Sequence, residues 1–111
     1  MRVAYDEVLA DRVRELLSAR ADVSERKMFG GLAFMLAGNM ACGVLGEELI
    51  VRLDREESER ALQEDGVRPF DFTGKPAKGI VYVSPQRTSD DAGLAEWVET
   101  GADFAATLPP K

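Results

Sequence analysis

The chain has 111 residues, of which 45% are hydrophobic, and it carries a formal net charge of −6 at pH 7. This length suits one domain over residues 1–111, and no apolar run approaches the roughly 20 residues that a membrane-spanning helix needs. The negative charge argues against non-specific nucleic-acid binding, which depends on lysine and arginine neutralising phosphates. An acidic N-terminal segment and a single cysteine predict a cytoplasmic protein rather than a secreted one.

The first half of the chain predicts one helix followed by three strands. Hydrophobic residues recur at three- and four-residue spacing over residues 5–20, which is typical of an amphipathic helix. Residues 23–27 are interpreted as a connection, with Ser24 as a turn residue. Strands are expected over residues 32–36, 40–45 and 49–53, because short glycine-containing segments separate these apolar runs.

The second half predicts a helix, a hairpin and a last helix. Asp54 is placed to cap a helix that runs to about residue 64. Strands over residues 69–73 and 79–84 are expected to pair around a turn that contains Gly74. The order α-β-β-β-α-β-β-α predicts an α+β domain, with an antiparallel sheet and helices packed on it.

The last helix has the clearest pattern of the chain. Thr88 and Ser89 offer capping oxygens, and Asp90 and Asp91 suit the positive N-terminal end of the helix dipole. Its apolar stripe includes Trp97 and Phe104, which we therefore expect to be core residues rather than a platform for a ligand.

The composition leaves few options for catalysis. The chain has no histidine, which removes Ser-His-Asp and Cys-His machinery and most catalytic zinc sites. Cys42 lies between Ala41 and Gly43 in an expected strand and is predicted to be a buried, inert thiol. Asp71 is expected to face solvent, whereas carboxylate catalysis would need it buried with a raised pKa. We therefore expect no catalytic, cofactor-binding or metal-binding residues.

A pair of glycines, Gly30 and Gly31, interrupts an apolar run near residue 30. Neither a dinucleotide-binding pattern nor a P-loop pattern fits the residues around them. A tight turn would leave only residues 27–29 as its first strand. One long strand, bent at the two glycines, is therefore the favoured interpretation, and a tight turn is the alternative.

Positive charges occur near the ends of several expected strands. Arg26 and Lys27 precede the bent strand, Arg68 precedes the fourth strand, and Lys75 and Lys78 lie in the last hairpin. If these ends meet in space, the five side chains form a basic corner on an acidic protein. That corner is the candidate interaction patch.

Several stretches together resemble a known family. They are KMFGGLAFM, the joint at residues 38–40, the segment VRPFDFTGKPAKGIVYV and the ending TLPPK. They resemble the N-terminal domain of the TfoX/Sxy competence regulators, and the chain is similar to small bacterial proteins that consist of that domain alone. The resemblance implies an α-β3-α-β2-α fold. Its motif, expected to be structural, consists of Met28, Phe29, Gly30, Gly31, Gly74 and Gly79.

The resemblance also implies a kind of function. The resemblance implies that full-length relatives carry a second, C-terminal domain, which we expect this chain to lack, and that they regulate genes for DNA uptake. We expect a non-enzymatic regulatory module that acts through a protein partner such as the transcription machinery, as a monomer or a homodimer and without a cofactor. Direct DNA binding through Arg26, Lys27, Lys75 and Lys78 is the alternative. A small-molecule-binding domain or a carboxylate-based enzyme is a remote one.

Overall fold

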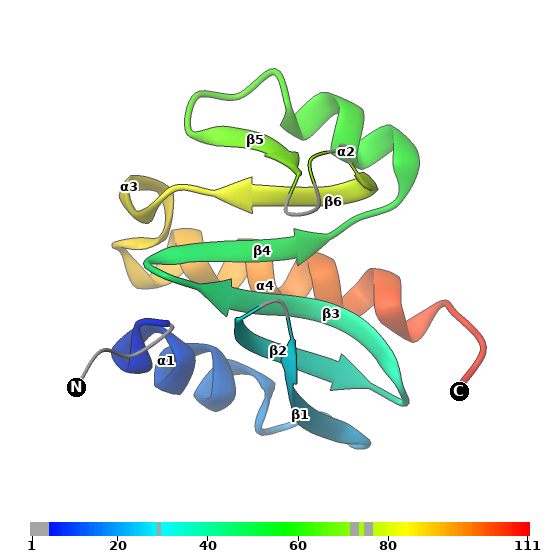
Figure 1. The fold of residues 1–111 in the computed structure, drawn as a ribbon. Coiled ribbons are helices and arrows are strands. Elements are labelled where there is room, and N and C mark those ends of the chain that lie inside the picture. Colours follow the sequence, from blue (N-terminus) through cyan, green and yellow to red (C-terminus); the bar gives the residue numbers. More distant parts are fainter. Residues whose placement is uncertain (1–4, 29, 72–73, 75–76) are drawn as a thin grey trace.

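The computed structural model describes residues 5–28, 30–71, 74 and 77–111. Its strands form one antiparallel sheet with the order β1-β2-β3-β4-β6-β5 (Figure 1). The strands are β1 (Val23–Met28), β2 (Gly31–Leu36), β3 (Asn39–Leu45), β4 (Glu48–Arg52), β5 (Val67–Phe70) and β6 (Ala77–Val83). The helices are α1 (Glu7–Leu17), α2 (Arg55–Ala61), α3 (Pro85–Thr88) and α4 (Asp91–Ala106).

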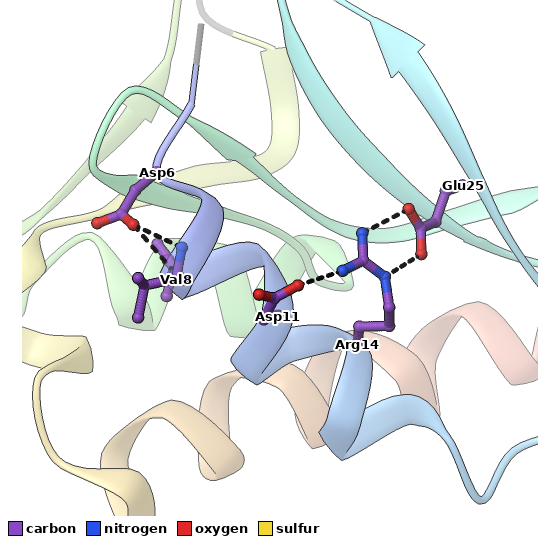
Figure 2. Close-up of polar contacts among 6 residues, drawn as sticks. Asp6, Val8, Asp11, Arg14 and Glu25 are labelled. Atoms are coloured by element: carbon purple, nitrogen blue, oxygen red, sulfur yellow. Dashed lines mark hydrogen bonds and ion pairs between the residues drawn. The ribbon is translucent and has the colours of Figure 1, made fainter. Parts of the chain in front are cut away.

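Aspartate side chains begin three of the helices. Asp6 Oδ1 accepts hydrogen bonds from the backbone N–H groups of Val8 and Leu9, at 2.9 and 3.2 Å (Figure 2). Asp54 caps α2 as the sequence predicts, at 2.8 Å from the backbone nitrogen of Glu57. Asp90 caps α4, whereas Thr88 ends the short helix α3 and does not cap α4. Each cap satisfies N–H groups that the first turn of a helix leaves unpaired.

The main core lies between the sheet and the helices. Figure 1 shows α4 running behind β3 and β4, and α4 also contacts α1. Gly101 allows this close packing, because a Cβ atom there would lie 2.4 Å from the carbonyl oxygen of Ala41. Trp97 and Phe104, predicted as core residues, are only half-buried. Trp97 packs against the edge of the core, while the buried stripe of α4 runs through smaller residues: Leu94, Val98, Gly101, Ala102 and Ala105.

A second, smaller apolar cluster lies on the other side of the sheet. Its buried members come from β2, β3, β4 and β6: Ala33, Met35, Met40, Ile50 and Tyr82. Half-buried side chains from neighbouring strands surround them: Met28, Leu45, Phe70 and Ile80. Both sides of the central strands are therefore apolar, which explains why these strands read as continuous hydrophobic runs in the sequence.

The segment expected to be a connection is the strand β1. It pairs antiparallel with β2, from Val23 opposite Leu36 to Met28 opposite Gly31. The chain therefore makes a tight turn between Met28 and Gly31, and Gly30 has the positive φ of 78° that such turns require. The bent-strand interpretation is wrong and its alternative, the tight turn, is correct. Phe29 lies outside the described residues.

The α+β class and the antiparallel sheet covered by helices are confirmed. The expected elements occur in the expected order, and the structure adds β1 and α3 to them. The strand expected over residues 69–73 is β5, which begins two residues earlier; Phe72 and Thr73 lie outside the described residues. In the described part of the chain, no helix is both long enough and apolar enough to cross a membrane.

Candidate functional site

The sheet topology separates the residues of the expected basic corner. Arg26 and Lys27 lie on β1 at one edge of the sheet, whereas Arg68 lies on β5 at the opposite edge. With roughly 4.8 Å between neighbouring strands, the two edges are more than about 20 Å apart along the sheet. Lys78 lies near the start of β6, and Lys75 is outside the described residues. The structure therefore does not bring Arg26 and Lys27 together with Arg68.

Arg68 is held by its own neighbours. Its Nη1 and Nη2 atoms donate to the two carboxylate oxygens of Glu48, at 3.0 and 2.6 Å. Its guanidinium carbon also lies 4.1 Å from the centre of the Tyr82 ring, and that ring packs against Phe70 at 5.0 Å between centroids. The charge of Arg68 is neutralised and its plane is stacked, so this side chain has little left to offer a partner.

The edge formed by β5 is closed to further strands. β5 has four residues, and the register shifts between Pro69 and Phe70. Proline has no N–H group to donate to another strand, and an irregular register disrupts a ladder of hydrogen bonds. Short length, proline and a bulge are three of the means by which proteins protect a sheet edge.

The edge formed by β1 is open. β1 has six residues and pairs with β2 without a register shift. The four central residues, from Ser24 to Lys27, are all exposed, and β2 is the element that β1 mainly contacts. Because hydrogen-bonded pairs alternate along an antiparallel ladder, every second residue of β1 directs its N–H and C=O groups away from the sheet.

Glu25, in the middle of β1, is neutralised from α1. Arg14 donates from Nη2 to Glu25 Oε1 at 2.8 Å and from Nε to Glu25 Oε2, and it also contacts Asp11 (Figure 2). The hydrogen bonds from Arg14 lower the pKa of the Glu25 carboxyl. At neutral pH, Glu25 is therefore an ionised group already matched by a cation.

Arg26 and Lys27 have no carboxylate within 4.0 Å among the described residues. Six other arginines do have one: Arg12, Arg14, Arg20, Arg55, Arg68 and Arg87. Arg52, Arg60, Lys78 and Lys111 likewise have no carboxylate within 4.0 Å among the described residues. Arg26 and Lys27 differ from these four because they are adjacent and lie on an edge strand. They give the β1 edge a local positive charge on an acidic protein.

Gly79, in the expected family motif, has a structural role. Its φ is 81°, and a Cβ atom there would lie 2.9 Å from the carbonyl oxygen of Leu53. The Gly79 carbonyl in turn accepts a 2.7 Å hydrogen bond from the Leu53 N–H. Glycine is needed here because the chain entering α2 lies directly beside the start of β6. Lys78 and Gly79 line a cavity of about 220 Å³ between α2 and β6.

The candidates for catalysis occupy structural positions. Cys42 is fully buried in β3, which confirms the prediction of a buried thiol, and burial raises the pKa of that thiol to about 12. Asp71 is exposed as expected, and its carbonyl oxygen accepts from the Gly74 N–H at 2.8 Å. Within the described ranges, no group of three or more histidine, cysteine, aspartate or glutamate side chains is arranged to hold a metal ion.

Comparison with family models gives a match to the TfoX N-terminal domain over residues 15–105. The chain belongs to the TfoX N-terminal domain family. The resemblance inferred from the sequence motifs is thereby confirmed. The match runs from α1 into α4, so both edges of the sheet are part of the TfoX N-terminal domain. No curated protein matches the chain significantly.

Proposed function

We propose that this TfoX N-terminal domain is a non-enzymatic regulatory module that acts by binding a protein partner through the edge of β1. The observation that carries the proposal is the pair of exposed cations, Arg26 and Lys27, on an open edge strand. Exposed strand edges are common docking places for partner chains, because the main chain supplies hydrogen bonds and the side chains supply selectivity.

The chemistry of the chain favours binding over catalysis. There is no imidazole to act as a base, and the lone thiol is buried with a raised pKa. The exposed Asp71 lacks the burial that general acid–base catalysis by a carboxylate requires. A function in gene regulation follows from the resemblance to competence regulators, so a protein of the transcription machinery is the first partner to look for.

Direct DNA binding has less support than protein binding. A DNA-binding surface gains its affinity by neutralising several phosphates at once. The sheet places Arg68 at the far edge from Arg26 and Lys27, and Arg68 is occupied by Glu48. The β1 edge offers two adjacent cations, which suit a short acidic segment of a protein better than a duplex.

A pull-down from lysate of the native cell, with and without nuclease, tests the proposal. Three forms with an N-terminal tag are compared: the wild type, the double variant Arg26→Glu/Lys27→Glu, and the control Arg55→Glu/Arg60→Glu. The control makes the same change of charge at two exposed arginines on α2, outside the candidate interaction patch.

We expect a protein that is retained after nuclease treatment by the wild type and the control, and lost by the Arg26/Lys27 variant. Recovery that requires intact nucleic acid would replace the proposal with DNA binding. Equal recovery by all three forms would show that the partner uses another surface.

A further inference from the structure

We infer that β1 binds an acidic, extended segment of its partner, which adds to the sheet as an antiparallel strand beside β1. This inference rests on the proposed function and specifies the chemistry of the partner. It rests on three observations: the free main-chain groups of the edge, the charges of its side chains, and the poor fit of a second copy of the chain.

The main chain of β1 is suited to accept another strand. Residues Val23 to Met28 pair with β2 in an unbroken register, so no bulge interrupts the ladder that a further strand would continue. The exposed residues Ser24 to Lys27 leave that side uncovered by other described elements. Strand addition of this kind draws affinity from main-chain hydrogen bonds and selectivity from alternate side chains.

A second copy of β1 is a poor occupant. In an antiparallel pair, side chains directly opposite each other lie on the same face of the sheet. In a pair with two-fold symmetry, one residue must therefore lie opposite its own copy, with the symmetry axis between the two.

The two registers with the longest overlap centre on Glu25 and on Arg26. The Arg26-centred register places Arg26 opposite its own copy, and like charges directly opposite each other destabilise a strand pair. Its Lys27 lies opposite a Glu25 that is already bonded to Arg14. The Glu25-centred register places Arg26 opposite Ser24 and Lys27 opposite Val23, so it gives neither cation a carboxylate.

An acidic segment avoids this conflict. Glu25 is already neutralised by Arg14, so it adds little repulsion, while Arg26 and Lys27 have no carboxylate partner among the described residues. Carboxylates directly opposite Arg26 and Lys27 would complete two cross-strand ion pairs. The two cations that a second copy of β1 leaves without a free carboxylate thus select a partner of the opposite charge.

The register of β1 with β2 defines which residues of β1 share a face. Lys27 lies opposite Leu32 and Glu25 opposite Phe34, so Val23, Glu25 and Lys27 face the helix-covered core. Arg26 lies opposite Ala33, so Ser24, Arg26 and Met28 face the second cluster. Both terminal residues of β1, Val23 and Met28, are half-buried and apolar.

A matching partner strand can therefore be written residue by residue. Read antiparallel from Met28 to Val23, it has an apolar residue, two acidic residues, two polar residues and an apolar residue. The apolar ends would pack on Met28 and Val23, and the acidic pair would lie opposite Lys27 and Arg26. The polar residues would lie opposite Glu25 and Ser24.

The test uses the full chain and the synthetic peptide Ser-Val-Glu-Glu-Thr-Thr-Val-Ser, blocked at both ends. Backbone amide signals of the protein are followed by NMR during titration. Two control peptides are used: one with lysine in place of both glutamates, and one with the same residues but N-methylated at alternate positions, so that its N–H groups on one edge are removed.

We expect the acidic peptide to shift the amide signals of residues 23–28 and to protect them from hydrogen exchange. The N-methylated peptide should not do so, because it cannot complete the ladder. Arg26→Glu/Lys27→Glu should weaken binding of the acidic peptide about tenfold and improve binding of the lysine peptide. Arg55→Glu/Arg60→Glu should leave both affinities unchanged.

Three results would overturn the inference. They are the absence of shifts in β1 at millimolar acidic peptide, equal binding of the N-methylated peptide, or a dimer of the chain that forms through β1. The proposed function is judged separately by the pull-down. A protein partner that depends on Arg26 and Lys27, combined with no binding of the acidic peptide, would retain the function and reject the strand-addition chemistry.

Discussion

Both edge strands of the sheet carry basic residues, but the contacts of these residues differ. On β5, Arg68 is bonded to both oxygens of Glu48 and stacked on Tyr82, and Pro69 blocks the main chain. On β1, Arg26 and Lys27 are exposed without such partners among the described residues, and the main chain is regular. The comparison teaches that a cation on an edge strand can bind a partner only when no neighbouring carboxylate or aromatic ring already contacts it.

The edges also differ in how they relate to the core. Val67 of β5 is buried in the main core, and β5 is joined to β6, against which α2 packs. β1 is attached chiefly through β2, and its central residues contribute no buried side chain. We therefore expect β1 to be the more easily opened of the two edges, as edges with few buried contacts generally are.

The largest effect on stability should come from a change that destabilises the whole sheet, because both edges would then open together. Gly101→Ala places a methyl group against the carbonyl oxygen of Ala41, where α4 crosses β3. We expect the free energy of unfolding to fall by about 2 kcal/mol, because backbone has to move to relieve the contact. Urea unfolding followed by Trp97 fluorescence measures this change.

Hydrogen exchange should then become faster at both edges together. Ala106→Val adds bulk at an exposed position of the same helix and serves as the control, with an expected change within about 0.5 kcal/mol. A loss of protection confined to β1 in the Gly101→Ala protein would contradict the assignment of α4 as the support of the whole sheet.

A smaller effect should separate the two edges directly. Arg68→Ala removes a bidentate ion pair and a stacked guanidinium at a half-exposed site, so we expect the free energy of unfolding to fall by about 1 kcal/mol. Arg26→Ala should change it by less than about 0.5 kcal/mol, since Arg26 has no such contacts among the described residues. Chemical denaturation measures the free energy of unfolding of both variants. An equal decrease in the two variants would refute the contrast between the edges.

The smallest effect concerns Glu25 and depends on pH. Arg14 lowers the pKa of Glu25 in the folded protein, so the ion pair stabilises the fold above the ordinary carboxyl pKa of about 4.3. This contribution is lost as the pH falls through the lowered pKa. Glu25→Gln should therefore reduce the free energy of unfolding by about 0.5 kcal/mol at pH 7, because the pair is partly exposed.

The wild type and Glu25→Gln should become equally stable at a pH well below 4. Glu47→Gln, at an exposed position without an ion pair among the described residues, is the control and should match the wild type throughout. A Glu25→Gln deficit that persists unchanged in acid would mean that the Arg14 contact contributes through packing and not through charge.

The sequence predicts the core elements well because their apolar residues recur with a clear period. Residues 32–36, 40–45 and 49–53 are recognisable as strands, since they are buried on both faces and bounded by glycine turns. β1 is missed for the opposite reason. Its central residues, Ser24 to Lys27, are exposed on both faces, so an edge strand of this kind leaves no hydrophobic alternation to detect.

Two further errors have different causes, and the first follows from missing β1. Without a strand before Met28, the tight turn after it looked too short to be a hairpin, which favoured the bent-strand interpretation. The basic corner failed because strand order is not local information. β6 pairs with β4 and places β5 at the far edge, so Arg68 is carried away from Arg26 by contacts between distant parts of the chain.

The way in which the C-terminal residues are held affects where a purification tag can be attached. The Lys111 N–H donates to the Ala37 carbonyl at 2.8 Å, and the Asn39 side-chain amide donates to the Pro109 carbonyl at 2.9 Å. The Ala37 N–H in turn bonds the carbonyl of Asp22, the residue before β1, at 2.9 Å. A purification tag fused after Lys111 would therefore emerge next to Val23, the first residue of β1. A tag at the N-terminus avoids covering the β1 edge.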